Sequence, residues 1–391
     1  MIENSRNNSF LVLVNFSAAR TAGTINYCIG FINAIDKLGL LPSVRILASP
    51  QLFAAFRGNS SVRDRMFTSV FFKATFSRVL YEQIVFPLLV IRFRASCMFC
   101  AFEIVPLLCQ VPVLLGIRNP SPINKSSSWE SSRYLRSIRS ILQKYAVSVS
   151  TRKATLVFFP SQFASNSIGD KLRVPAFKRR VVYHGVDRSY WGQEIIEGHS
   201  ILKKYSLSSK RFFLFTSMLY PYKGAHILIN AYARAYEFFR SERIKLVIVG
   251  GIADEKYFNR LKTLSRSLCV DSEDITFLGF LPKEELRVLY KTALCFVLPT
   301  TLETFGQPFL EAMASGLPIV TTNIDVAREI CDDAAIYFEG NDAVELSDTL
   351  RVLLTDDYLQ KGLTFNALRR VMNFSWEKEV LETFDLLYEL V

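Results

Sequence analysis

The sequence has few of the residues from which metal sites and disulfide frameworks are built. It holds 7 cysteines and 3 histidines in 391 residues. Cys97-x-x-Cys100 is the only close cysteine pair, and with neither a second such pair nor a nearby histidine it is typical of a buried core. The odd number and the scatter of the cysteines fit a reducing compartment. We therefore expect no disulfide framework and no bound metal.

Long hydrophobic runs are also missing. Residues 1–9 are polar and the apolar run at 10–14 is short, which is not the pattern of a secretory signal. The longest apolar stretch, residues 97–117, is interrupted by a glutamate, a glutamine and two prolines. That pattern suits two short buried strands better than a membrane span of about 20 residues. We expect no transmembrane helix and a cytoplasmic location.

Charge is distributed unevenly along the chain. The formal net charge is +11, but residues 1–190 hold 25 Lys and Arg against 8 Asp and Glu, which gives +17. The remaining residues hold 22 and 28, which gives −6. A strongly basic half indicates an anionic partner such as a membrane surface, nucleic acid or a phosphorylated acceptor. A solvated basic face is the alternative that composition leaves open.

Hydrophobic periodicity predicts an α/β protein of two domains. At about 150 residues per domain, the length suits two. A buried strand at residues 10–16 leads into a loop at 20–23, and Thr24 is expected to cap a helix that ends at Gly39. The same order of strand, loop and helix begins again at residues 211–216, and the polar stretch at 190–199 is the expected linker.

Two of these loops carry residues suited to phosphate. Gly23 follows the first strand, where it fits either a phosphate loop or a simple tight turn. Lys223 lies in the loop at 218–224, before a helix predicted at 226–240. A lysine beside the free amides of a helix start is well placed to neutralise a diphosphate, and a solvated loop lysine is the alternative.

The stretch at residues 299–323 combines two carboxylates with a helix start. A buried strand predicted at 293–298 ends beside Glu303, and Gly306 permits a sharp turn into a short helix at 309–314. Glu311 falls about one turn inside this helix. The unpaired amides of a helix start suit phosphate, and carboxylates suit hydroxyl-rich sugars, so the pattern indicates a nucleotide-sugar site.

The first half offers further candidates. Arg118 and Asn119 follow a strand predicted at 113–117, and ligands bind at this edge of open α/β sheets, although a surface salt bridge would also explain Arg118. Residues 129–145 form a basic amphipathic helix, suited either to acidic lipid or to packing on its own domain. His184 stands at a strand end, where an isolated histidine is more often structural than catalytic.

Several motifs together resemble one protein family. They are PYKG at 221–224, LVIVGG at 246–251, ITFLGFLPKEELRVLY at 275–290 and ETFGQPFLEAMASGLPIV at 303–320, with GVD at 185–187 and FSWE at 374–377. This set resembles the group-1, glycogen-synthase-like (family-4 type) retaining glycosyltransferases of the GT-B fold. The resemblance implies two Rossmann-like domains facing each other across a cleft, an acceptor domain at 1–192 and a nucleotide-sugar domain at 193–374, with a helix at 375–391 that packs back on the first.

Carried onto matching positions, the resemblance implies roles for single residues. Glu303 would face the transferred sugar and, with Lys223, form the catalytic set. Glu311 would bind the ribose hydroxyls of the donor, and base recognition would rely on the backbone near Phe280 and Leu281. The remaining donor-binding positions are Phe305, Gly306, Gln307 and Gly23. With no Asp-x-Asp motif present, the implied reaction uses neither metal nor cofactor and retains anomeric configuration.

The chain departs from the family pattern at the phosphate-binding positions. Ser217-Met218 stands where relatives often carry Gly-Arg, so one expected cation is missing, and Arg20 or Arg118 is a candidate to replace it. Arg118-Asn119 also occupies what resembles the place of a family histidine near the sugar. These changes bear mainly on the acceptor side.

The expected function is transfer of a hexose or deoxyhexose from a UDP- or GDP-sugar. The acceptor would be a polyprenyl-diphosphate-linked or other glycan in bacterial surface polysaccharide synthesis, of the O-antigen (lipopolysaccharide) or capsule type. The protein would then bind the anionic inner face of the cytoplasmic membrane peripherally. A nucleotide-sugar epimerase or hydrolase, and an inactive homologue acting as an assembly partner, remain alternatives. Nucleic acid is not expected, because no recognition motif interleaves aromatic and basic residues.

Overall fold

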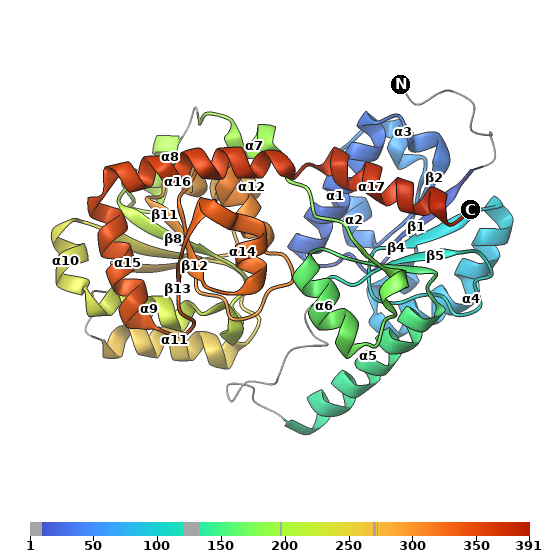
Figure 1. Ribbon diagram of the computed structural model, residues 1–391, viewed down its shortest axis with the longest axis horizontal. Coiled ribbons are helices and arrows are strands. Elements are labelled where there is room, and N and C mark those ends of the chain that lie inside the picture. Colours follow the sequence, from blue (N-terminus) through green and yellow to red (C-terminus); the bar gives the residue numbers. More distant parts are fainter. Residues whose placement is uncertain (1–9, 120–132, 196–197, 269–270, 272) are drawn as a thin grey trace. The chain divides into compact units, whose positions relative to one another are not determined.

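The computed structural model describes residues 10–119, 133–195, 198–268, 271 and 273–391. Among these residues the chain divides into two compact units (Figure 1). Unit 1 runs to Gly185 and resumes at Phe374, and unit 2 is Val186–Asn373. The chain thus leaves unit 1 a few residues before the expected boundary at 192/193, because Trp191 packs inside unit 2, where its ring meets that of Tyr290 at 5.2 Å.

Unit 1 is built on a parallel sheet with the strand order β3-β2-β1-β4-β5-β6-β7. Its strands are β1 (Val12–Phe16), β2 (Val44–Ala48), β3 (Met66–Phe67), β4 (Cys97–Cys100), β5 (Val113–Gly116), β6 (Leu156–Phe159) and β7 (Arg179–Val181). Its helices are α1 (Ala22–Lys37), α2 (Pro50–Ala55), α3 (Ser60–Arg63), α4 (Thr75–Phe93), α5 (Arg133–Lys153), α6 (Gln162–Lys171) and α17 (Trp376–Glu389), with short 3-10 turns η1 (Leu41–Ser43), η2 (Val70–Lys73) and η3 (Ala176–Lys178).

Both faces of this sheet are covered, as its mainly apolar central strands require. Along β1, Val12, Val14 and Phe16 belong to one core cluster, while Leu13 belongs to another. The two expected strands within residues 97–117 are therefore confirmed, and Cys97 and Cys100 are buried core residues of β4. Of the basic helix expected at 129–145, the first four residues lie outside the described part of the chain.

The helix after β1 begins earlier than expected. Thr21, not Thr24, is the N-cap of α1, and the Thr24 side chain completes a capping box from inside the helix. The prediction that Thr24 caps the helix is wrong because both threonines can accept from main-chain amides, and the pair is satisfied only in this order. Gly23 consequently lies in the first turn of α1.

Unit 2 repeats the architecture with the strand order β10-β9-β8-β11-β12-β13. The strands are β8 (Phe212–Thr216), β9 (Lys245–Val249), β10 (Ile275–Gly279), β11 (Cys295–Leu298), β12 (Ile319–Thr322) and β13 (Ala335–Phe338). The helices are α7 (Arg188–Gly192), α8 (Gly198–Lys204), α9 (Ala225–Arg234), α10 (Tyr236–Ser241), α11 (Glu255–Ser267), α12 (Lys283–Thr292), α13 (Gln307–Ala314), α14 (Asp325–Cys331), α15 (Ala343–Thr355) and α16 (Asp357–Arg370), with η4 (Pro221–Lys223), η5 (Asp332–Ala334) and η6 (Val371–Asn373).

The single helix expected at 226–240 is two helices. Ala235 leaves helical geometry with φ −112° and ψ 29° and separates α9 from α10. The break lets Phe239 turn into the core, where its ring stacks on Tyr232 at 5.4 Å and meets Phe213 edge-on at 5.1 Å. Packing of the aromatic rings therefore overrides the helical periodicity here.

The last helix returns to unit 1, as expected, and lies along α1 (Figure 1). The close approach depends on Gly30, because a Cβ there would come within 2.3 Å of the Trp376 ring. A buried carboxylate fixes the helix further. Glu379 Oε2 accepts from the Gly185 amide at 2.9 Å, and Oε1 lies 3.0 Å from His184 Nδ1. These contacts tie α17 to the segment that follows β7.

We expect Glu379→Ala to destabilise unit 1 by about 2–4 kcal/mol, since it leaves a buried amide and a buried imidazole without their acceptor. Chemical denaturation with separate spectroscopic and proteolytic probes would measure the loss. Asp385→Ala is the matched control, because Asp385 is exposed on the same helix and should change stability by no more than about 0.5 kcal/mol. Equal stability of the two variants would contradict this role for Glu379.

Candidate functional site

Two loops of unit 2 meet at the C-terminal ends of adjacent strands β8 and β11. The Tyr222 carbonyl accepts from the Thr301 amide at 2.8 Å and from the Thr300 hydroxyl at 3.2 Å. Gly224 has φ +76°, and a Cβ there would lie 1.9 Å from the Pro299 carbonyl oxygen. Only glycine fits at this position. The sequence PYKG therefore folds directly onto the loop that carries Glu303.

This contact brings together the two residues expected to be catalytic. Lys223 Nζ donates to Glu303 Oε1, and the side chains are only 14% and 9% exposed. A buried ion pair is stable only while both partners are present. An incoming diphosphate would therefore compete with Glu303 for the ammonium group of Lys223, which makes the pair suited to respond to ligand.

Helix α13 starts directly after this pair. Gly306 is its N-cap with φ +88°, and a Cβ there would come within 2.4 Å of the Phe309 ring. Pro308 occupies the first turn, as expected, and Gly306 has no side chain with which to cap the helix. Phe305 is buried and Gln307 is partly buried. The turn thus presents main-chain amides next to Lys223, an arrangement that suits a phosphate group.

Glu311 lies one turn into α13 in a different environment. Burial raises the pKa of its carboxyl group to about 7, although a hydrogen bond from Tyr290 and the charge of Lys283 act in the opposite direction. The Tyr290 hydroxyl also bonds to the Thr216 side chain at the end of β8. A carboxylate that is poorly solvated and ionises near neutral pH is a strong acceptor for the paired hydroxyls of a ribose.

Tyr290, Thr216 and Lys283 were not among the expected site residues. In the sequence, Tyr290 occupies an apolar position of an amphipathic helix and is typical of core packing. The structure shows that its ring is buried while its hydroxyl reaches Glu311. Lys283, at the start of the same helix, lies 4.1 Å from the centre of the Tyr190 ring. The one signal in the sequence that could have identified Tyr290 was its hydroxyl, because the hydroxyl of a buried tyrosine usually finds a hydrogen-bond partner.

The glycine pair after β9 joins the same edge of the sheet. Gly250 has φ +149° and donates its amide to the Gly279 carbonyl at 2.8 Å. The two residues that follow Gly279 differ in solvent exposure, because Phe280 is 69% exposed and Leu281 is buried. Met218, which replaces the arginine frequent in relatives, lies against Gly251. The expected base-binding segment therefore follows a residue that is bonded to the glycine pair after β9, and this pair is itself bonded to the loop that follows β8.

The candidates of unit 1 lie at the C-terminal edge of its own sheet. Arg118 Nε donates to His184 Nε2 at 3.0 Å, and its guanidinium lies 3.3 Å from the centre of the Tyr27 ring. Arg20 donates to the Phe72 carbonyl, and the Asn119 amide donates to Glu103 at 3.0 Å. Both guanidinium groups are thus partly engaged within unit 1.

These contacts define the state of His184, for which the sequence offered no partner. Because an arginine Nε can only donate, Nε2 of His184 must accept, and Nδ1 carries the proton that is donated to Glu379. Burial and the charge of Arg118 lower the pKa of this imidazole. His184 is therefore a neutral link between Arg118 and the C-terminal helix, and its position is structural.

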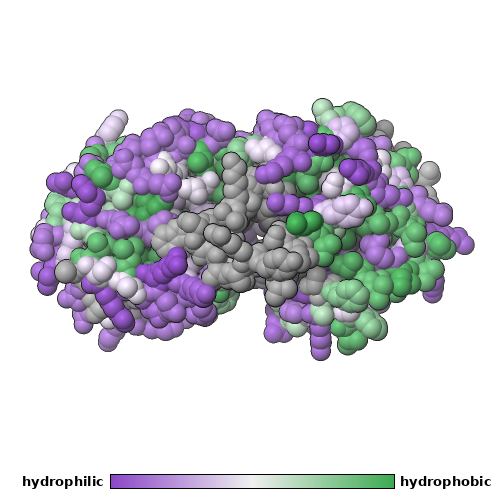
Figure 2. All heavy atoms as spheres, turned by 90° about the horizontal axis from the view of Figure 1, so that it is seen from below, coloured by the Kyte–Doolittle hydropathy of each residue, from purple (hydrophilic) through white to green (hydrophobic). Residues whose placement is uncertain are grey.

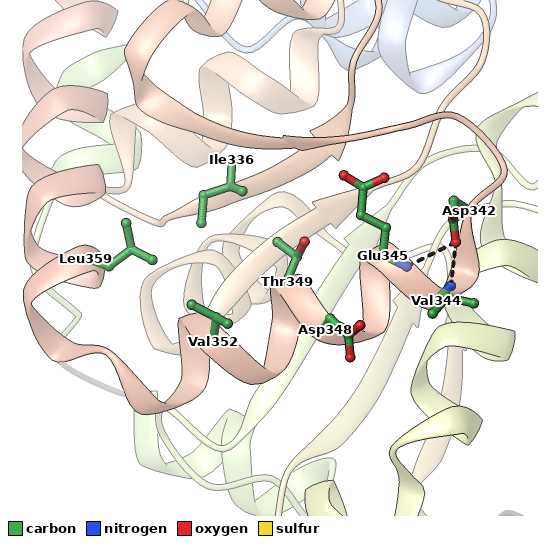
Figure 3. Close-up of a pocket in the computed structure, with 8 residues that line it drawn as sticks. All are labelled: Ile336, Asp342, Val344, Glu345, Asp348, Thr349, Val352 and Leu359. Carbon is green, nitrogen blue, oxygen red and sulfur yellow. Dashed lines mark hydrogen bonds between the residues drawn. The ribbon is translucent and has the colours of Figure 1, made fainter.

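A cavity of about 680 Å³ lies elsewhere in unit 2, between β13, α15 and α16 (Figure 3). Its acidic residues already have local tasks. Asp342 caps α15 by accepting from the amides of Val344 and Glu345, and Glu345 accepts from the Glu339 amide. The lining contains no basic residue that could bind phosphate, so we do not assign the donor to this cavity. Within the described residues no cluster of three metal-ligating side chains occurs.

The raised pKa of Glu311 leads to a test of its environment. A carboxyl whose folded pKa lies above its unfolded value of 4.5 favours folding below pH 4.5 and loses that contribution as pH rises to about 7. We expect Glu311→Gln to be more stable than the parent above pH 7, by up to about 3 kcal/mol, with the difference vanishing near pH 4. Denaturation of both proteins from pH 4 to 8 measures this. A difference that does not vary with pH would contradict the assignment.

The chain is similar in sequence to several known proteins. Residues 200–370 match the family model described as glycosyl transferases group 1. O-antigen chain mannosyltransferase B of Escherichia coli is 28% identical over 234 residues, 59% of this chain and 60% of that protein. O-antigen chain mannosyltransferase RfbU of Salmonella typhimurium is 27% identical over 205 residues, 52% of each chain. The match therefore spans less than two thirds of the length of either relative.

Solved structures share the fold along the whole chain. Anabaena HepE, crystallised with UDP and glucose, superposes with a TM-score of 0.76 at 16% identity, covering 97% of this chain and 100% of its own. WaaG, a glycosyltransferase involved in lipopolysaccharide biosynthesis, gives a TM-score of 0.70 at 14% identity, covering 96% and 99%. Residues 200–370 thus match the group-1 glycosyl transferases, and the chain shares the two-sheet GT-B fold of these solved structures.

Proposed function

We propose that the chain is a retaining, metal-independent glycosyltransferase that moves a hexose or deoxyhexose from a UDP- or GDP-sugar to a membrane-associated glycan acceptor. The observation that carries the proposal is the largely buried Lys223–Glu303 pair just before the start of α13, with Glu311 about one turn inside that helix. Cation, amides and two carboxylates are thereby gathered at one sheet edge of unit 2, where open α/β sheets bind ligands.

Each group has a distinct task in donor binding. The Glu311 carboxylate accepts hydrogen bonds from the ribose hydroxyls, and the backbone near Phe280 and Leu281 recognises the base. Lys223 and the amides at Phe305 and Gly306 bind the diphosphate. In this arrangement the nucleotide lies along the edge formed by the loops after β8, β10 and β11, whose main-chain contacts hold them together.

Stabilisation of the leaving group supplies the catalysis. As the bond between sugar and diphosphate breaks, negative charge grows on the phosphate oxygens, and Lys223 and the helix-start amides already point to that position. Glu303 releases the ammonium group to the diphosphate and then faces the sugar. The departing phosphate accepts the proton of the attacking hydroxyl on the same side of the ring, so configuration is retained without a separate protein base.

The acceptor side of the proposal rests on unit 1 and on the relatives. Residues 1–190 carry a formal charge of +17, which favours an acceptor with diphosphate and a location at an anionic membrane surface. Arg118, Asn119 and Arg20 are the candidate acceptor or phosphate contacts, whereas Gly23 at the first turn of α1 is a candidate contact of the donor. The two similar O-antigen mannosyltransferases support a role in surface polysaccharide synthesis, and a cytoplasmic location is part of our proposal.

Substitution of the buried pair tests the proposed chemistry. We expect Lys223→Met and Glu303→Gln each to reduce kcat for sugar transfer by about 10²–10³-fold, since each removes a group that acts on the departing diphosphate or the sugar. Lys361→Met, an exposed lysine of unit 2, is the matched control and should retain full activity. Transfer rates measured with radiolabelled donor decide the matter, and full activity of either pair variant would sink the proposed mechanism.

Ligand-induced thermal stabilisation tests donor binding without any acceptor. We expect UDP or GDP to raise the Tm of the protein more than ADP or dTDP does. Glu311→Ala should lower the affinity for that nucleotide by about 10-fold or more, because a buried hydrogen-bond acceptor is lost. Product analysis separates transfer from the alternatives. Release of free sugar to the same extent with and without acceptor would indicate a hydrolase. Conversion of the donor to a different nucleotide-sugar would indicate an epimerase, and a protein that binds no nucleotide would be an inactive homologue.

A further inference from the structure

Helix α4 is amphipathic in the opposite sense to an ordinary surface helix. Its buried face consists of Arg78, Glu82, Phe86 and Val90, four residues apart in sequence. A row of five apolar residues on the opposite side of the helix is exposed to solvent by 50% to 82%. It consists of Phe76, Leu80, Ile84, Leu88 and Ile91, and we call it the α4 face.

The buried face prevents the helix from rolling to hide these side chains. Glu82 is fully buried, accepts from Arg78 at 3.0 Å and is bonded to the Ser17 hydroxyl just after β1. Turning α4 over would break these bonds and bury the rest of the helix at the cost of exposing Phe86 and Val90. The exposure of the α4 face is therefore a built feature of unit 1.

Neighbouring segments enlarge the apolar area. Phe71 stacks on Tyr81 of α4 with ring centres 5.9 Å apart, and Val70 beside it is also exposed. On another side Gln83 bonds to the main chain of residues 105 and 107, which holds exposed Leu107 next to the helix. Figure 2 shows a broad hydrophobic area on the right-hand body, which is unit 1. A contiguous exposed apolar area of this kind marks an interaction surface.

Charge around the α4 face selects the occupant. Between residues 67 and 94 the one acidic residue, Glu82, is buried, whereas Lys73, Arg92 and Arg94 are exposed at the two ends of the helix. A second copy of the chain would bring together two units with a formal charge of +17 each over residues 1–190. An anionic bilayer, by contrast, offers headgroups to the basic rim and acyl chains to the apolar side chains.

We infer that the α4 face docks unit 1 onto an anionic lipid bilayer, with Phe76, Leu80, Ile84, Leu88 and Ile91 buried at the headgroup boundary. The inference rests on the proposed function in that it identifies the surface through which the enzyme reaches a lipid-borne acceptor. Among the described residues no helix could span a membrane. Docking in the plane of the interface is the mode of attachment that a helix with this exposed face supports.

Vesicle flotation tests the inference. The parent protein should float with phosphatidylcholine vesicles that contain phosphatidylglycerol, and much less with phosphatidylcholine alone. Leu80→Glu combined with Leu88→Glu should weaken binding by about tenfold or more, because both side chains leave the apolar interface and add negative charge. Lys73→Gln combined with Arg92→Gln should reduce the preference for the anionic lipid while leaving the apolar contact in place.

Tyr358→Glu combined with Phe365→Glu is the matched control, since both residues are exposed on one helix of unit 2, and it should bind vesicles as the parent does. Nucleotide binding and Tm should be unchanged in all variants, so that failure of docking and failure of donor binding are seen separately. Equal flotation of the α4 variant and the parent would overturn the inference. The inference would also be overturned if the parent protein did not bind vesicles, whether it is a monomer or a dimer that the α4 substitutions dissociate.

Discussion

The buried ion pair between Lys223 and Glu303 is the interaction around which unit 2 is arranged. It exists because Gly224 lets the loop after β8 touch Pro299 at the end of β11, a contact that any side chain would prevent. The same approach places Lys223 on Glu303, three residues before the N-cap of α13. A lysine with so little exposure is costly unless it is paired, and Glu303 is a partner that a diphosphate can replace.

Unit 1 uses buried charge differently. Arg118, His184 and Glu379 form a chain of contacts that ends on the helix contributed by the last residues of the sequence. Glu82 and Arg78 likewise face the interior, beneath a helix whose outer side is apolar. In both places polar groups fix the orientation of a helix that hydrophobic packing alone would leave ambiguous. The basic and apolar exterior that results suits a partner of lipid and phosphate.

The sequence predicted the parts of the site that depend on neighbours along the chain. Gly306, Pro308 and Glu311 lie within six consecutive residues, so a helix start with a carboxylate inside it could be recognised from spacing alone. Contacts between distant positions could not be predicted from spacing. Examples are the hydrogen bond from Tyr290 to Glu311 and the one that Glu379 accepts from His184, 195 positions away. Periodicity also shows which residues of α4 share a face but not which face is buried, because that depends on what β1 presents to it. The prediction of Thr24 as the cap was wrong for a local reason, because Thr21 competes for the same position and takes it.

The central claim is that the diphosphate of the donor takes Lys223 from Glu303. Calorimetric titration of the nucleoside diphosphate tests it most directly, in the parent, in Glu303→Gln and in Lys223→Met. If the claim holds, Glu303→Gln binds the diphosphate at least as tightly as the parent, because its lysine no longer has a competing carboxylate, while Lys223→Met binds it more weakly. Weaker binding in Glu303→Gln, to the same extent as in Lys223→Met, would contradict the account.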